Sequence, residues 1–328
     1  MDMSLWQAMQ WPAPVFQLVE FTGTFLGAGA VGFRYAAMRG AEVGSQAPDR
    51  DRPILDDALQ RAAVLGLIGA VLALGRSAIV LPSIAARQHT TLSGLIFGTG
   101  TMLVSVTLML LAFLGFLAAS RRIGWGWGVA AVGVIARSFL NLFSGNLMRL
   151  VNPLHMLTAG LWIGTLFVLA IAGIGTVLRH PAAAGRRGPL VAAMVHAFSP
   201  LALTMGGLLV LSGVITAWNH LPSIDALWTT VYGAMLFRKL IFVAMVFALG
   251  AWNWRRQRPT LGSEEAARSI RRSAWWELGV AGIVMVLTAI LVSVPSPKEE
   301  RESGTSRGEV SGRAAPAGTP APASPAAR

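Results

Sequence analysis

Apolar residues run along the chain in long stretches that short polar segments separate. Eight such stretches lie near residues 15–37, 62–85, 95–119, 124–146, 153–178, 199–218, 235–254 and 275–294. Each approaches the roughly 20 residues that a helix needs to cross a bilayer. They lack the short alternating strands of a barrel, and backbone groups in lipid must be satisfied within the segment. The pattern therefore predicts an all-α polytopic integral membrane protein, a bundle of eight transmembrane helices.

Composition supports a membrane location. Hydrophobic residues make up 54% of the chain and charged residues 13%, whereas a soluble domain carries roughly 25% charged residues. The chain has no cysteine, which excludes disulfides and thiolate metal sites. Any soft metal that binds here must use histidine, methionine or carboxylate ligands.

Basic residues cluster on alternate connections between the apolar stretches. The odd-numbered connections hold sixteen Lys and Arg residues, and the even-numbered ones hold two. By the positive-inside rule, the segments near 39–61, 179–198 and 255–272 are cytoplasmic and both termini are periplasmic. This clustering explains the net charge of +12, so we do not expect nucleic acid as a partner.

The familiar catalytic motifs are absent from the sequence. It has no G-x-x-x-x-G-K-[ST], no G-x-S-x-G and no H-E-x-x-H. The glycines at 27, 29, 32, 206 and 207 lie inside apolar stretches, where we expect them to serve helix packing. We therefore predict that the protein is not an enzyme.

Polar groups in or near the membrane are costly and are candidates for function. In the predicted topology His89, His155 and His220 lie on the outer side. His155 begins a polar stripe that includes Asn152 and Trp162, and a second stripe with Ser212 and Thr216 ends at His220. Two such stripes ending in histidine at the same depth could frame one metal site, because neutral imidazole binds copper, zinc and haem iron. The alternative is that each histidine only caps a helix or forms hydrogen bonds within the bundle.

Methionine adds soft ligands near the same depth. Met148 and Met156 flank His155, and Met102 and Met235 fall near the outer ends of other stretches. Thioethers suit Cu(I), although most methionines in apolar helices only fill the core.

Charged residues also interrupt the apolar stretches. Glu20, Arg76, Arg137, Arg238 and Lys239 lie in the outer half, and Glu277 lies near the inner start of the last stretch. Glu20 should pair with Arg76 or Lys239, and Arg76 is favoured because the first two stretches are sequential. The remaining positive charge either snorkels to the headgroups or holds an anion. We expect Lys239 and Glu277 to be structural or gating charges rather than metal ligands.

Several stretches from Asn152 onward resemble the copper resistance protein D (CopD) family of bacterial inner-membrane proteins. They are LHMLTAGLWIG (154–164), FSPLALTMGGLLVLSGVITAW (198–218), TTVYGAMLFRKL (229–240), GAWNWRR (250–256) and RRSAWWELGVAGIVMVLTAILVSVPSP (271–297). The recurring positions of this family fall on His155, Trp162, Tyr232, Lys239, Asn253 and Glu277, whereas His89 and His220 lie outside the matching stretches.

The resemblance implies a copper ion transport protein of the bacterial inner membrane, with uptake from periplasm to cytoplasm and copper delivered by a separate periplasmic copper-binding protein. Under this hypothesis copper is both partner and bound ion, with His155 as principal ligand and with His220, His89, Met148 and Met156 as candidate neighbours. The alternative from a different class is a haem-binding membrane redox protein, with histidines as axial ligands and arginines on the propionates. A third possibility is a membrane assembly factor without a metal of its own.

Four regions follow from these patterns. Residues 1–14 form a periplasmic N-terminus, 15–151 a four-helix membrane half, and 152–296 a CopD-like four-helix membrane domain. Residues 297–328 form a tail rich in Pro, Ala, Gly and Ser, which we expect to be disordered.

Overall fold

The protein is described here by a computed structural model that covers residues 12–44, 48–140, 142, 148–221, 223–257 and 262–294. These residues form helices and connections and contain no strand. One continuous helix comprises α2 (Ala13–Gly32), η1 (Phe33–Met38) and α3 (Arg39–Val43), and another comprises α8 (Met148–Ala159), η3 (Gly160–Gly164), α9 (Thr165–Val168), η4 (Leu169–Ile174) and α10 (Gly175–Arg179). The others are α4 (Pro48–Arg87), α5 (Leu92–Gly98), α6 (Gly100–Ser120), α7 (Gly126–Ser138), η5 (Pro181–Ala183), α11 (Arg187–His220), α12 (Ala226–Thr229), α13 (Val231–Gln257) and α14 (Glu264–Val292). The prediction of an all-α polytopic membrane protein is confirmed.

Seven helices of the described chain are long and apolar enough to cross a membrane. They match seven of the eight predicted stretches. The fourth stretch, 124–146, contains α7, whose 13 residues extend about 20 Å and are too short for a hydrocarbon core of about 30 Å. Most of its remainder, and the whole predicted tail 297–328, lie outside the described residues. The predicted count of eight is therefore not confirmed.

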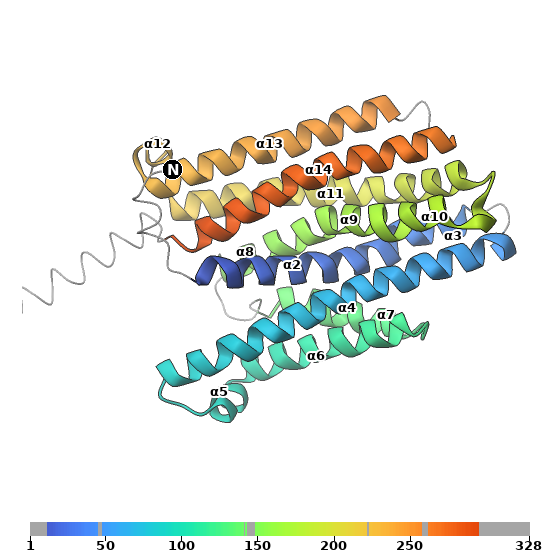
Figure 1. Ribbon diagram of the computed structural model, residues 1–328. Helices are drawn as coiled ribbons and strands as arrows, with labels where there is room; N and C mark the ends of the chain where they lie inside the picture. The colour runs from blue at the N-terminus through green and yellow to red at the C-terminus, as the bar shows by residue number, and fades with distance from the viewer. Residues whose placement is uncertain are drawn as a thin grey trace, which may run out of the picture.

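The helices run side by side in one bundle (Figure 1). Helix α2 contacts α4 on one side and η3 and α14 on others, so it touches both predicted membrane halves. We call the end where α2 and α8 begin and α11 ends the outer end, and the opposite end the inner end, following the predicted topology. The α3–α4, α6–α7, α10–α11 and α13–α14 connections all lie at the inner end (Figure 1). The connections that carry most of the basic residues thus lie at one end of the bundle, as predicted.

Glycines allow the helices to approach closely. A Cβ on Gly29 would collide with the backbone of Gly164, and one on Gly32 would collide with the Thr165 hydroxyl, where α2 crosses η3 and α9. Gly133 on α7 similarly faces the backbone of α6. The predicted packing role is confirmed for Gly29 and Gly32, whereas a Cβ on Gly207 would meet nothing within 4 Å. Small residues of this kind let membrane helices pack without a hydrophobic driving force.

Candidate functional site

Two polar stripes meet where α8 packs against α11. His155 Nδ1 lies 2.9 Å from Ser212 Oγ. Nearer the outer end, the Thr216 hydroxyl donates to Asn152 Oδ1 at 3.1 Å. The predicted stripes on the fifth and sixth stretches therefore face each other, although Asn219 is exposed and takes no part.

The hydrogen bonds of Ser212 indicate which nitrogen of His155 carries the proton. The Ser212 hydroxyl has one hydrogen, and the Leu208 carbonyl oxygen lies 2.8 Å away as an acceptor one turn back. With that hydrogen donated to the backbone, Ser212 Oγ accepts from the Nδ1–H of His155. Nε2 then keeps its lone pair, which is the arrangement of a metal-binding histidine held by a second hydrogen bond.

The ring of His155 sits against Gly213 and near Lys239. A Cβ on Gly213 would lie 3.2 Å from His155 Cε1, so the ring occupies the space that a larger side chain would fill. Lys239 on α13 is half-buried, and its charge acts on the His155 ring. An ammonium has no lone pair to give, so Lys239 does not add a ligand.

His220 occupies another level of the same stripe. Its Nδ1 lies 2.8 Å from the Thr216 carbonyl oxygen, which can only accept, so Nδ1 carries a proton. The ring stacks on Tyr232 with centroids 6.1 Å apart. Because His220 follows Gly213 by seven residues, about 10 Å along the helix axis separates them. His155 and His220 therefore face different turns of α11, and a metal site framed by both stays a prediction.

The other predicted ligands face other surroundings. Met156 lines a cavity of about 690 Å³ between α2, α4, α6, α7 and α8, whereas its neighbour His155 faces α11. His89 is exposed in the connection after α4, and the side chain of Met148 lies outside the described residues. Within the described chain, no three His, Asp or Glu side chains form a group that could hold a metal ion. In the described chain His155 is therefore not part of a group of three side chains that could hold a metal ion.

Glu20 and Arg137 line that cavity, and Arg76 completes a cluster of three charges with them. Glu20 Oε2 is 2.9 Å from Arg76, and Glu20 Oε1 is 3.7 Å from Arg137. The predicted Glu20–Arg76 pair is thus confirmed in preference to Lys239. Arg76 also donates to the Phe16 carbonyl oxygen at 3.2 Å. Two guanidinium groups share one carboxylate, so the cluster keeps a net positive charge.

Trp162 and Glu277 have partners that fit structural roles. The Trp162 ring is buried and contacts Phe247, with centroids 4.6 Å apart. Glu277 accepts a hydrogen bond of 2.5 Å from the Asn253 amide, which joins α14 to α13. Arg271, which lies near Glu277 in the sequence, instead donates to the Ala170 carbonyl oxygen.

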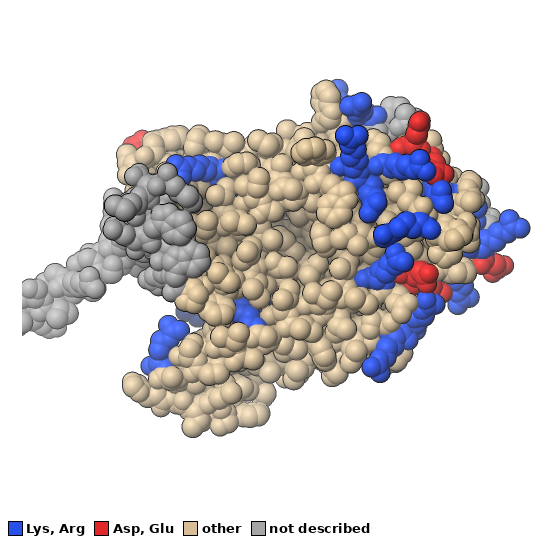
Figure 2. Space-filling model, in the orientation of Figure 1, with Lys and Arg blue, Asp and Glu red and all other residues tan. Residues whose placement is uncertain are grey.

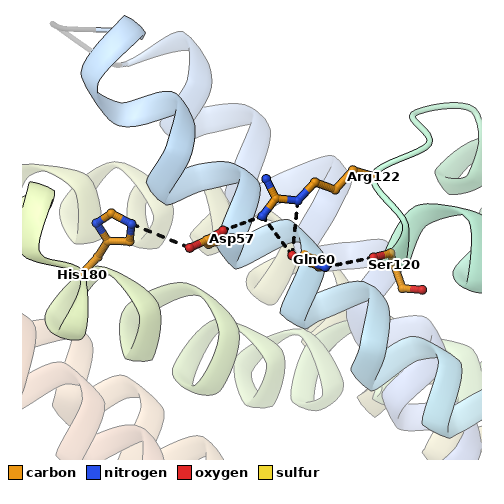
Figure 3. Close-up of polar contacts among 5 residues, drawn as sticks. All are labelled: Asp57, Gln60, Ser120, Arg122 and His180. Atoms are coloured by element: carbon orange, nitrogen blue, oxygen red, sulfur yellow. Dashed lines mark hydrogen bonds and ion pairs between the residues drawn. The ribbon is translucent and has the colours of Figure 1, made fainter.

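Acidic residues at the start of α4 tie the inner end together, and sequence reasoning missed them. Asp57 contacts Arg122 at 2.7 Å and His180 at 3.7 Å, and Gln60 donates to the Ser120 carbonyl oxygen at 3.2 Å (Figure 3). Asp51, which is fully buried, receives two hydrogen bonds of 2.6 and 2.7 Å from Arg186. The only signal for these contacts in the sequence is the run of aspartates before the second apolar stretch.

Comparisons with known proteins support the family that the motifs indicated. Residues 192–291 match the family model of copper resistance protein D. The chain is 32% identical over 154 residues to copper transport protein CutJ of Bacillus subtilis (strain 168), a match that covers 46% of this chain and 26% of the relative. The chain therefore spans about a quarter of the length of that curated relative.

Ser212, Lys239, Asn253 and Glu277 lie within the residues that the family model matches, whereas His155 and Trp162 precede them. No solved structure gives a significant match. Residues 192–291, which hold most of α11, all of α12 and α13 and nearly all of α14, are thus similar to copper resistance protein D, and we call them the copper resistance protein D segment.

Proposed function

We propose that this protein carries copper ions across the bacterial inner membrane, from the periplasm to the cytoplasm. The observation that carries the proposal is His155, which Ser212 holds with one ring nitrogen free at the contact between α8 and the copper resistance protein D segment. The name of the relative from Bacillus subtilis, a copper transport protein, supports the same ion.

His155 alone is suited to transfer rather than storage. A copper ion held in place needs several ligands, and the described residues hold no group of three His, Asp or Glu side chains that could bind a metal ion. Soft N and S donors suit Cu(I). His220, further along the polar stripe, supplies a second imidazole at another level, so copper would pass along α11 by exchange of ligands. A separate periplasmic copper-binding protein would deliver the ion.

The test compares cellular copper with and without the gene, together with two matched histidine variants. His155→Ala should remove the gene-dependent copper accumulation while the protein stays in the membrane. His196→Ala changes an exposed histidine of the same helix bundle on the inner half of α11 and should leave accumulation unchanged.

Three results would contradict parts of the proposal. Normal accumulation in the His155→Ala strain removes the role of His155. Higher cellular copper in cells that lack the gene reverses the direction to export. A Soret band in the absorption spectrum of the purified protein in detergent would favour the haem-binding redox function over transport.

A further inference from the structure

Two arginine side chains converge on one point near the inner end of the bundle. Arg179 ends α10, and Arg271 lies two turns into α14. A Cβ on Gly175 would lie 3.3 Å from a terminal nitrogen of Arg179 and 3.8 Å from one of Arg271. Because both distances start from the same point, the two nitrogens are at most about 7 Å apart. Two positive charges therefore lie close to each other.

Backbone carbonyl groups hold both side chains in place. Arg179 Nε donates to the Gly175 carbonyl oxygen at 2.8 Å, and Arg271 Nε donates to the Ala170 carbonyl oxygen at 3.3 Å. Ala170 lies in the π-helical stretch η4, whose wider turn changes the helical hydrogen-bond pattern. Both bonds use Nε, so the terminal nitrogens of the two guanidinium groups remain available on the same side.

Neither guanidinium group has an acidic partner in the part of the chain that the structure describes. Five other arginines of this end do have one: Arg34 binds Glu42, Arg122 binds Asp57, Arg186 binds Asp51, and Arg187 and Arg268 both bind Glu264. The Arg179–Arg271 pair thus differs from these five arginines. Like charges at this distance repel each other, most strongly where lipid lowers the dielectric, so an anion between them would stabilise the arrangement.

The position of the pair indicates where that anion comes from. Lys and Arg side chains gather at the inner end, on the face shown in Figure 2. Trp275 and Trp276 follow Arg271 by one turn on α14 and are 44% and 68% exposed, and exposed tryptophans of membrane proteins lie at the level of the headgroups. Arg179 is exposed and Arg271 is half-buried. The pair therefore lies open at the depth of lipid phosphates.

We propose that Arg179 and Arg271 bind the phosphate of an anionic phospholipid in the inner leaflet. Planar guanidinium groups match phosphate oxygens in geometry and in charge. The phosphate would bridge the terminal nitrogens of both arginines, while the exposed tryptophan rings would pack against the glycerol and acyl region. The lipid would join the long helix that carries His155 to α14 of the copper resistance protein D segment.

The test measures binding of phosphatidylglycerol to the purified full chain in detergent by native mass spectrometry, with phosphatidylcholine as the neutral lipid. The Arg179→Gln/Arg271→Gln double variant should bind phosphatidylglycerol about tenfold to thirtyfold more weakly than the unchanged protein. The Arg255→Gln/Arg256→Gln variant removes two exposed arginines at the end of α13 and should bind it normally. Arg179→Gln alone, at an exposed position, serves if the double variant does not fold.

Two further measurements distinguish a specific lipid site from a general basic surface. Lysine at both positions keeps the charge but loses the planar donors, so binding should fall between the two extremes. Inorganic phosphate at millimolar concentration should not displace the lipid. Equal losses in the two glutamine double variants, or full binding with both lysines, would show only a diffuse basic surface, and displacement by inorganic phosphate would show a site for the free ion.

Discussion

The two ends of the bundle are held together in different ways. At the inner end, charged side chains join helices that are far apart in sequence, as in the Asp51–Arg186 and Glu264–Arg187 pairs. At the outer end, α8 and α11 are joined by hydrogen bonds between neutral groups, His155 with Ser212 and Thr216 with Asn152. The charged cluster of Glu20 belongs to the outer half but lies on the other side of α8, at the cavity.

Under the proposed function, the difference separates the contacts that fix the helices from the contact that exchanges ligands. A neutral hydrogen bond contributes only about 0.5–1.5 kcal/mol net, so it can open and close when an ion arrives. A buried ion pair is expensive to break, because each lost partner leaves an unpaired charge. The inner end therefore fixes the helices, and the α8–α11 contact of the outer end keeps a free imidazole nitrogen.

The largest effect should follow from breaking the buried pair at the inner end. Asp51→Asn leaves the Arg186 guanidinium group without its charged partner. Because Asp51 is 1% exposed and Arg186 is 25% exposed, we expect a loss near the low end of the roughly 3–5 kcal/mol seen for buried pairs. Thermal unfolding of the purified protein in detergent measures it. Asp49→Asn, at an exposed position of the same turn, is the control, and equal stability of the two variants would contradict the comparison.

The next effect concerns the charged cluster at the cavity. Glu20→Gln leaves Arg76 and Arg137 facing each other inside the membrane bundle, and we expect a loss of roughly 1.5–3 kcal/mol, the contribution of a hydrogen bond to a charged group. The same thermal assay applies. Glu42→Gln removes the more exposed carboxylate that pairs with Arg34 and should cost less than about 1 kcal/mol. A larger loss of stability in Glu42→Gln than in Glu20→Gln would contradict this prediction. It would mean that removing a carboxylate inside the membrane bundle costs no more than removing one at the surface.

A third prediction tests the hydrogen bond that prepares His155. Ser212→Ala removes the acceptor of Nδ1–H, so the ring is no longer held with Nε2 free, and Cu(I) affinity should fall about 10–100-fold. Competition titration with a Cu(I) chelator measures the affinity. Ser199→Ala is the matched control, because Ser199 donates its hydroxyl hydrogen to the Val195 carbonyl oxygen of the same helix. Ser212→Thr keeps a hydroxyl group and should bind Cu(I) as the unchanged protein does. Unchanged affinity in Ser212→Ala would show that this hydrogen bond does not hold His155 for metal binding.

Much of the fold could be predicted because it depends on local patterns. The long apolar runs predicted the seven helices that are long enough to cross a membrane. The distribution of basic residues predicted which connections lie at the same end of the bundle. The fourth stretch differs because Phe139 and Leu140 continue its apolar run, yet α7 ends at Ser138. Composition reports whether a segment tolerates lipid, and it does not report where a helix ends.

The site could be predicted only in part because contacts depend on helix rotation and on distant residues. His155 and Met156 are neighbours in sequence, but adjacent side chains on a helix point about 100° apart, so one faces α11 and the other faces the cavity. Asp51 and Arg186 are 135 residues apart, and no local pattern links them. The Glu20–Arg76 pair could be predicted because sequential helices are usually neighbours.

The smallest effect should come from the exposed part of the inner end. Asp57→Asn removes the carboxylate between Arg122 and His180, but the side chains of Asp57 and Arg122 are 37% and 54% exposed. Water and salt screen such pairs, so we expect a loss below about 1 kcal/mol that shrinks further at high ionic strength. Thermal unfolding of Asp57→Asn, Arg122→Gln and the double variant gives the coupling between the two residues. A coupling as large as the loss in Asp51→Asn would show that the whole polar network of the inner end, and not only its buried pair, fixes the helices.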